Sequence, residues 1–157
     1  MTVSDAELAW FYQDCIAYLQ GGEDSSMPFM GGRHVSYRVG CTEEEWYEKA
    51  IAALARLGIS GLICCRCDQD NVHDIRVVLR ELFLDRSSMT WDGCYFELTE
   101  YGEKLAKEFH LEDEDEGNLL SRVLPGFREE LGRIFDEHGV GLDTDLPYDK
   151  LLSLKSN

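Results

Sequence analysis

The sequence predicts an α+β fold: a mostly helical single domain over residues 1–157, with a small antiparallel sheet built on a β-hairpin at 88–98. Three observations predict it. Several stretches carry apolar residues at helical spacing behind capping residues. One stretch alternates apolar and polar residues around Asp92-Gly93, a type I′ turn pair. The 157 residues, 44% of them hydrophobic, suffice for one core but not for two.

The chain before Gly40 is predicted to hold one helix, a loop and a strand. Ser4 and Glu7 form a capping box at the start of a helix over 4–20. Its apolar face comprises Leu8, Phe11, Tyr12, Cys15 and Leu19. The glycine- and serine-rich stretch 21–33 predicts a loop, and the alternation in 35–39 predicts a half-buried strand.

The next part of the chain is predicted as helix, strand and helix. Thr42 and Glu45 form a second capping box, and Gly58 is expected to end that helix in the left-handed conformation. The run 59–65 predicts a strand, because it is short, apolar and contains glycine. Apolar residues again recur at helical spacing over 73–85, which predicts another helix.

The hairpin at 88–98 carries the clearest strand pattern. A two-residue turn at Asp92-Gly93 places Met89 opposite Phe96. The apolar face of the hairpin then comprises Met89, Trp91, Cys94, Phe96 and Leu98. One apolar and one mixed face are typical of a sheet that packs on a layer of helices.

Further helices complete the prediction. Thr99 is a suitable N-cap for the next one, and an acidic loop at 111–118 follows it. Pro125 suits the first turn of a helix that Gly139 ends, and Pro147 starts a short last helix. The predicted core comprises Leu8, Phe11, Trp46, Leu54, Leu57, Leu79, Leu82, Phe96, Leu98, Leu105, Leu131 and Phe135.

Acidic residues are in large excess. The chain has 31 Asp and Glu against 15 Lys and Arg, a net charge of −16. A field of this sign repels phosphate backbones and attracts basic surfaces. We therefore expect a basic protein as partner and no direct contact with nucleic acid.

Two acidic segments are the candidate partner-binding sites. One is the dense run in the predicted loop, which consists of Glu112, Asp113, Glu114, Asp115 and Glu116. The other is the start of the second predicted helix, where Glu43 and Glu44 precede Trp46. Acids beside an aromatic side chain form a common kind of protein-binding surface, because the aromatic ring can anchor the contact.

Cysteines suggest the one candidate cluster for a metal or for catalysis. Cys64, Cys65 and Cys67 are followed by His73, but structural zinc sites usually use a Cys-x-x-Cys knuckle. In a strand, Cys65 and Cys67 would face one way and Cys64 the other. We expect reduced thiols, no metal, no cofactor and no catalysis. An enzyme or metal protein that uses segment 64–73 is the third hypothesis.

The stretch YFELTEYGEKL at 95–105 resembles the last wing strand and following helix of winged helix-turn-helix proteins. In that family a strand ending in Leu-Thr runs into a Thr-x-x-Gly helix start. The resemblance spans at most residues 42–110 and implies a winged-helix-like fold with 73–85 as the DNA-reading helix. Arg76 and Arg80 would then face DNA, but acids around them outnumber bases.

The sequence favours a cytoplasmic protein that binds another protein. The N-terminus lacks the pattern of a signal peptide, and no apolar segment has the length of a membrane helix. Our leading hypothesis is an inhibitor, immunity or anti-defence protein that covers a basic, nucleic-acid-handling partner. The alternative is a winged-helix transcriptional regulator.

Overall fold

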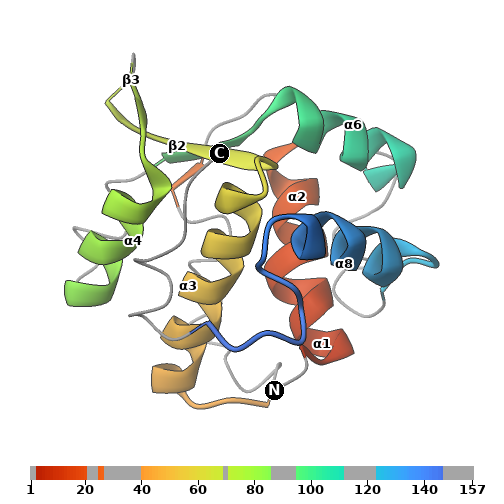
Figure 1. Ribbon diagram of the computed structural model, residues 1–157, viewed down its shortest axis with the longest axis horizontal. Coiled ribbons are helices and arrows are strands. Elements are labelled where there is room, and N and C mark those ends of the chain that lie inside the picture. The colour runs from red at the N-terminus through yellow and green to blue at the C-terminus, as the bar shows by residue number, and fades with distance from the viewer. Residues whose placement is uncertain are drawn as a thin grey trace.

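A computed structural model of the chain describes residues 3–20, 25–26, 40–68, 71–85, 95–111 and 123–146; of 25–26, 66–68 and 71–73 it describes the backbone alone. Helix α3 (Glu43–Ile59) runs through the middle, with the sheet across its C-terminal end (Figure 1). Helix α4 (Ile75–Leu84) lies on one side of α3, and α8 (Phe127–Glu137) lies on the other. The predicted α+β fold, mostly helical with a small antiparallel sheet, is confirmed.

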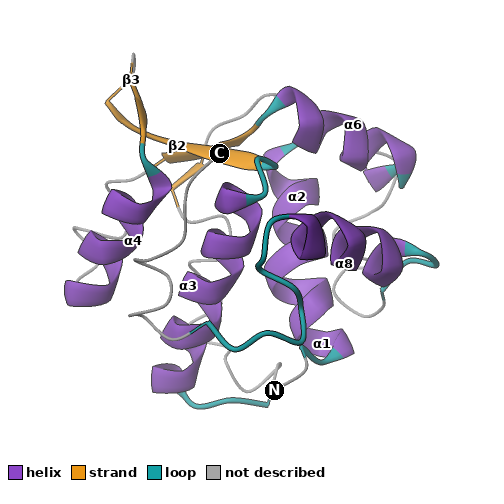
Figure 2. Cartoon of the chain, in the orientation of Figure 1, coloured by secondary structure: helices purple, strands orange, loops and turns teal. Residues whose placement is uncertain are grey.

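Figure 2 shows how helices and strands follow one another. The other helical elements are α1 (Asp5–Glu7), the π-helix η1 (Leu8–Gln13), α2 (Asp14–Leu19) and α6 (Glu100–Glu108). The strands are β1 (Ser25–Ser26), β2 (Ile63–Asp68), β3 (Asn71–His73) and β4 (Tyr95–Leu98). They form one sheet in the order β1-β4-β2-β3, with antiparallel neighbours.

The helix predicted at 4–20 is one helical segment with a wider turn inside it. Ser4 caps it, since its hydroxyl accepts a hydrogen bond from the backbone N–H of Glu7 at 3.2 Å. Over η1 the chain winds as a π-helix, which has more residues per turn than an α-helix. The adjacent residues Tyr12 and Gln13 are both buried there.

The start of α3 confirms the predicted capping box. The backbone N–H of Glu45 donates to Thr42 Oγ1, and that of Thr42 donates to Glu45 Oε1, both at 3.2 Å. The predicted end is wrong, because Gly58 lies inside α3 and Gly61 takes the left-handed φ of +81°. A Cβ on Gly58 would lie 2.5 Å from Ile75 Cγ1, so glycine lets α4 pack closely on α3.

Two further boundaries differ from the predicted ones. Strand β2 begins at Ile63, because α3 continues through Ile59 before the chain turns. His73, predicted to open a helix, is instead the last residue of β3, which pairs with β2. Helix α4 starts after Asp74, whose carboxylate accepts a hydrogen bond from the backbone N–H of Arg76 at 2.9 Å.

Strand β4 is the described part of the predicted hairpin; its predicted turn and first strand fall within 86–94, outside the described residues. Burial alternates along β4 as predicted. The predicted pairing of Phe96 with Met89 is wrong, because Phe96 pairs with Cys65 on one side and Ser25 on the other. Strand β1 itself lies in a stretch predicted to be a loop.

A threonine and a glycine hold the connection from β4 to α6. Thr99 Oγ1 accepts a hydrogen bond from the backbone N–H of Gly102 at 3.1 Å, so Thr99 caps α6 as predicted. The backbone N–H of Thr99 donates to the carbonyl oxygen of Leu62 at 3.1 Å. A Cβ on Gly102 would lie 2.2 Å from that oxygen, so only glycine lets α6 approach the α3–β2 connection.

Helix α8 begins later than predicted. Its first residue is Phe127 rather than Pro125, and the N-cap is Gly126 with a left-handed φ of +79°. Gly139, with a φ of +73°, follows its end as predicted. His138 Nδ1 lies 2.9 Å from a backbone carbonyl oxygen of the preceding turn, as expected for a histidine that caps a helix.

One hydrophobic core connects elements from Val3 to Leu142. Every residue of the predicted core is buried: Leu8, Phe11, Trp46, Leu54, Leu57, Leu79, Leu82, Phe96, Leu98, Leu105, Leu131 and Phe135. The strand predicted at 35–39 and the helix after Pro147 lie outside the described residues. In the part of the chain that the structure describes, no helix has the length and apolar character needed to cross a membrane.

Candidate functional site

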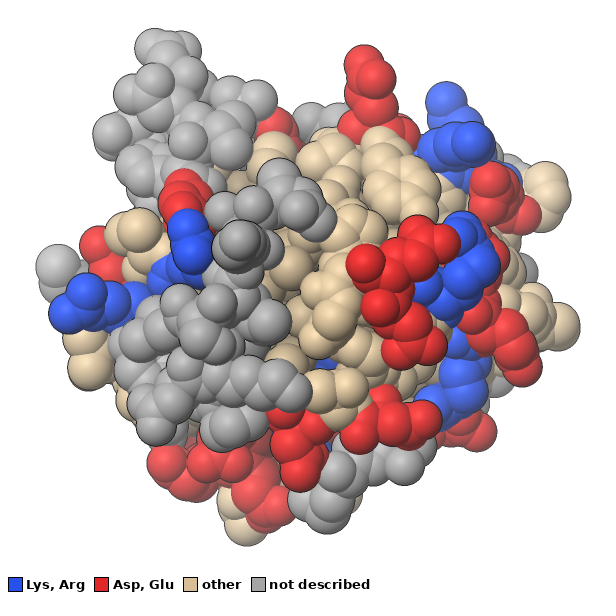
Figure 3. All heavy atoms as spheres, viewed as in Figure 1, with Lys and Arg blue, Asp and Glu red and all other residues tan. Residues whose placement is uncertain are grey.

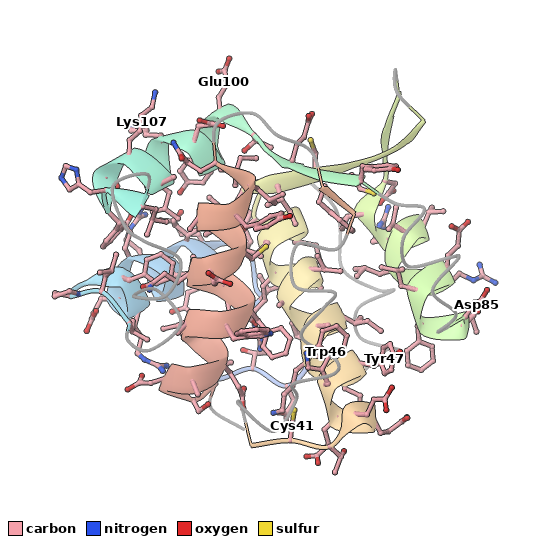
Figure 4. All side chains as sticks on the ribbon, turned by 180° about the vertical axis from the view of Figure 1, so that it is seen from behind. Cys41, Trp46, Tyr47, Asp85, Glu100 and Lys107 are labelled. Carbon is pink, nitrogen blue, oxygen red and sulfur yellow. The ribbon has the colours of Figure 1, made fainter. Side chains whose placement is uncertain are left out.

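The predicted partner-binding residues have different places in the structure. Glu43 and Glu44 are exposed in the first turn of α3. Trp46 is 0% exposed, and its ring lies 5.9 Å from that of Phe11 and 5.4 Å from that of Tyr47 (Figure 4). The prediction that Trp46 anchors a partner at the surface is therefore wrong. The run Glu112, Asp113, Glu114, Asp115 and Glu116 lies outside the described residues.

The acids at the start of α3 contribute to the stability of that helix. The hydrogen bond from the backbone N–H of Thr42 lowers the pKa of Glu45. Carboxylates in a first turn also interact favourably with the positive end of the helix dipole. Glu43 and Glu44 therefore have a local structural role that does not depend on a partner.

The cysteine segment is partly described. Cys65 is buried, and Cys64, on the opposite face of β2, is half-buried with Sγ 3.5 Å from Glu97 Oε1. The side chains of Cys67 and His73 lie outside the described residues. Among the side chains that are described, no three or more His, Cys, Asp or Glu gather as a metal-binding group.

A different acidic surface lies along α8. A hollow of about 710 Å³ opens there, and its walls consist of Arg128, Glu129, Gly132, Arg133, Asp136, Glu137, Leu142 and Asp143. Four acids and two arginines give these walls a net charge of −2. Figure 3 shows charged side chains gathered over α8 on the face toward the viewer. We call this surface the α8 hollow.

Both arginines of the α8 hollow are bonded to acids. Arg133 Nη1 lies 2.7 Å from Glu137, and the same guanidinium donates to Glu130. These bonds lower the pKa of Glu130 and raise that of Arg133. Arg128 pairs with Asp5 of α1 at 2.7 Å. The positive charge in the hollow is therefore already neutralised.

All four carboxylates of the hollow are exposed, and three of them have no cationic partner among the described residues. Glu129, Asp136 and Asp143 form no ion pair with any described residue. Asp136 and Glu137 also lie in the last turn of α8, which contains no basic residue. Carboxylates there face the negative end of the helix dipole, at a cost of about 0.3–1 kcal/mol each. Local helix stability therefore does not explain Asp136, whereas Glu137 is bonded to Arg133 within the same helix.

Arg56 bonds, from inside the protein, the segment after α8 that contributes Leu142 and Asp143 to the hollow. It belongs to α3 and is 4% exposed. Its Nε donates to the carbonyl of Val140 at 3.0 Å, and its Nη2 donates to those of Gly141 and Thr144 at 3.2 and 2.7 Å. Its Nη1 donates to Tyr12 Oη at 2.9 Å. Burial raises the pKa of Tyr12, so the hydroxyl stays protonated.

The π-helix η1 contacts both flanks of α8. Gln13, which is 0% exposed, accepts a hydrogen bond from the backbone N–H of Leu124 at 2.9 Å, just before α8. Tyr12 accepts a hydrogen bond from Arg56, which in turn bonds segment 140–144 after α8. Consecutive side chains of one wide turn are thus linked to the segments before and after α8, Gln13 directly and Tyr12 through Arg56.

The sequence analysis missed the α8 hollow, Arg56 and Gln13. One signal could have identified Arg56: it is the only charged residue from Ala50 to Ile59, in a helix that has no polar face there. Such a helix is buried all round, so its charge must be satisfied inside the protein. Gln13 had no comparable signal, because the ordinary helical period does not predict a π turn.

The hollow has the chemistry of a cation-binding surface. Its carboxylates can accept charge-assisted hydrogen bonds from ammonium or guanidinium groups. Among the described residues, those that line it include no histidine, cysteine, serine or lysine. No protein-family model, curated protein or solved structure matches this chain.

Proposed function

We propose that this is an acidic, cytoplasmic protein-binding protein that inhibits a basic, nucleic-acid-handling partner, and that the α8 hollow is its contact surface. One observation carries the proposal. The exposed carboxylates of Glu129, Asp136 and Asp143 are not neutralised by described residues, and Asp136 lies where it costs helix stability. Charge that a fold keeps against its own stability is typical of a functional surface.

The mechanism is electrostatic and steric. The net charge of −16 attracts a basic surface over a long range and speeds association. In the complex, lysine or arginine side chains of the partner would bond to the hollow, as they would otherwise bond to phosphates. Nucleic acid is then excluded because its binding surface is covered.

Two other acidic segments belong to the proposal as secondary contacts. Glu43 and Glu44 are exposed at the far end of α3, and the run Glu112–Glu116 precedes α8 in sequence. Their charge adds to the attraction of a basic partner. We rank them below the hollow because the acids of α3 also stabilise their own helix.

The test combines partner capture with matched charge reversals. The immobilised chain is exposed to nuclease-treated cell extract, and the retained protein is purified and assayed for nucleic-acid binding by gel shift. We expect the retained protein to be basic, and to release nucleic acid once one molecule of this chain has been added per molecule of partner. A partner that still binds nucleic acid in the complex would contradict the proposal.

The charge reversals locate the contact. The double variant Glu129→Lys with Asp143→Lys changes the hollow, and Glu43→Lys with Glu44→Lys makes the same change in net charge on α3. We expect the first pair to slow association by about tenfold or more. The second pair should slow it less, because it weakens only the long-range attraction and removes no direct contact. A larger effect of the α3 pair would move the contact to that helix.

The alternative proposal, a winged-helix regulator, can be tested with the purified chain and DNA, without a partner protein. The surface of α4 carries Arg76 and Arg80 but also Asp74 and Glu81, and Arg76 is bonded to Asp74 at 3.1 Å. This balance of charge does not form a phosphate-binding stripe. We expect no gel shift of duplex DNA at physiological salt, and a tight shift would favour the regulator.

A further inference from the structure

We infer that Arg56 acts as a latch: one buried guanidinium holds segment 140–144, which contributes Leu142 and Asp143 to the α8 hollow, and its loss releases that segment while the rest of the fold remains. The inference goes beyond the proposed function, because it concerns how the hollow keeps its shape whatever binds there. It rests on the placement of the hydrogen bonds of Arg56.

The bonds of Arg56 surround the residues that line the hollow. A single nitrogen, Nη2, donates to the carbonyls of Gly141 and Thr144. Leu142 and Asp143, which line the hollow, lie between those two carbonyls in the chain. The guanidinium therefore braces the turn from the inside, while Asp143 is exposed on the outside.

Segment 140–144 has little backbone support of its own. The backbone N–H of Val140 bonds to the carbonyl of Phe135 at 3.0 Å, and that of Thr144 bonds to the carbonyl of Gly141 at 3.0 Å. The segment forms no described strand or helix. Arg56 thus supplies most of its polar contacts with the remainder of the protein.

The latch depends on the shape of the guanidinium as well as on its charge. No carboxylate in the described part of the chain pairs with Arg56, so carbonyl dipoles and the hydroxyl of Tyr12 compensate its charge. Its donors point in several directions from one plane. A lysine has all its donors on one nitrogen and cannot reach carbonyls on separate sides at once.

The experiment measures hydrogen exchange of single amides by NMR in the full chain. The variants are Arg56→Met, which removes the donors, and Arg56→Lys, which keeps the charge. Arg133→Met is the matched control, because it removes an arginine from the outer surface of the same hollow. The reporter is the amide of Thr144, and the reference amides lie in the middle of α3.

We expect both Arg56 variants to speed exchange at Thr144 by about tenfold or more, with amides in the middle of α3 changing less than about threefold. In Arg133→Met, Thr144 should exchange within about threefold of the unmodified chain. An unchanged rate at Thr144 in both Arg56 variants would overturn the latch. Equal acceleration in α3 and at Thr144, or failure of both variants to fold, would also overturn it, because the latch is separable from the core. Hydrogen exchange is measured on each variant without a partner, so these results do not depend on the proposed function.

Discussion

Helices α3 and α8 both carry more acids than bases, but different parts of the chain hold their ends. The start of α3 is capped by Thr42 and Glu45, which are three residues apart. Helix α8 starts after Gly126, which has no side chain to cap it. The backbone N–H of Leu124, just before α8, donates instead to the side chain of Gln13, which lies 111 residues earlier in the sequence. The segment after α8 is bonded by Arg56 from 84 to 88 residues away.

The difference extends to their acids. At the start of α3, acids complement the helix dipole and complete a capping box. At the end of α8, acids oppose the dipole and line a hollow. The same residue type is therefore structural in one helix and, by our proposal, functional in the other.

The largest effect is expected where a distant side chain holds α8. Gln13→Leu leaves the buried backbone N–H of Leu124 without its partner and should lower the free energy of unfolding by about 1–3 kcal/mol. Urea unfolding followed by circular dichroism measures it. Gln20→Leu, at the end of the same helical segment, is the matched control. Equal losses in both variants would show that this contact does not hold α8.

A smaller effect is expected at the local cap of α3. Thr42→Ala removes the hydroxyl that accepts the backbone N–H of Glu45 and should cost about 1 kcal/mol. Thr42→Ser keeps the hydroxyl and should retain most of the stability. The same unfolding assay applies. A loss larger than that of Gln13→Leu would reverse the ranking of the two helices.

Opposite signs are expected for acids at the two helix ends. Asp136→Asn should raise the free energy of unfolding by about 0.3–1 kcal/mol, because it removes charge from the negative end of α8. Glu43→Gln should lower it by a similar amount, and 1 M salt should shrink both changes. A stability loss in Asp136→Asn would mean that Asp136 has a structural role.

The smallest effect is expected from the pH dependence of the Glu130–Arg133 pair. The hydrogen bond that Glu130 accepts from Arg133 lowers the pKa of Glu130 in the folded protein. The stabilisation from this pair is therefore full above the ordinary glutamate pKa of about 4.3, and it is lost as the pH falls through the lower pKa of Glu130 in the folded protein. Glu130→Gln should thus destabilise the protein more at pH 7 than at pH 3. The effect is small because both side chains are partly exposed. A loss that grows toward acid pH would contradict the assigned pair.

Much of the fold could be predicted because its signals are local. The caps of Ser4, Thr42 and Thr99 act over three residues, and each hydroxyl accepts the predicted backbone N–H. The reciprocal bond of the capping box predicted at Ser4 and Glu7 is not formed, because the Glu7 carboxylate accepts from Lys49 instead. The apolar positions of the predicted core are buried, because helical and strand periods place them on one face. Errors occurred where a neighbour decided the outcome. Ile75 packs on Gly58 inside α3, and Ser25 takes the edge of β4 expected for Met89.

The candidate site was less predictable. Composition indicated an acidic protein, and helix spacing placed Trp46 in the core as well as near the acids of α3. Only the core placement is observed, because the ring packs against Phe11 of another helix. The α8 hollow combines Asp143 with acids of α8 across a chain reversal. No local pattern shows which acids share one surface after such a reversal.

The net charge, the local caps and the set of apolar residues that the core needs can all be read from the sequence without a structure. These properties depend on residue type and on neighbours within a few positions. Which acids stay unpaired, which aromatic rings reach the surface and how Arg56 is satisfied depend on how the helices pack. Those outcomes rest on contacts between residues far apart in the sequence, such as the bonds from Arg56 to Val140, Gly141 and Thr144, and such contacts exist only once the helices have packed.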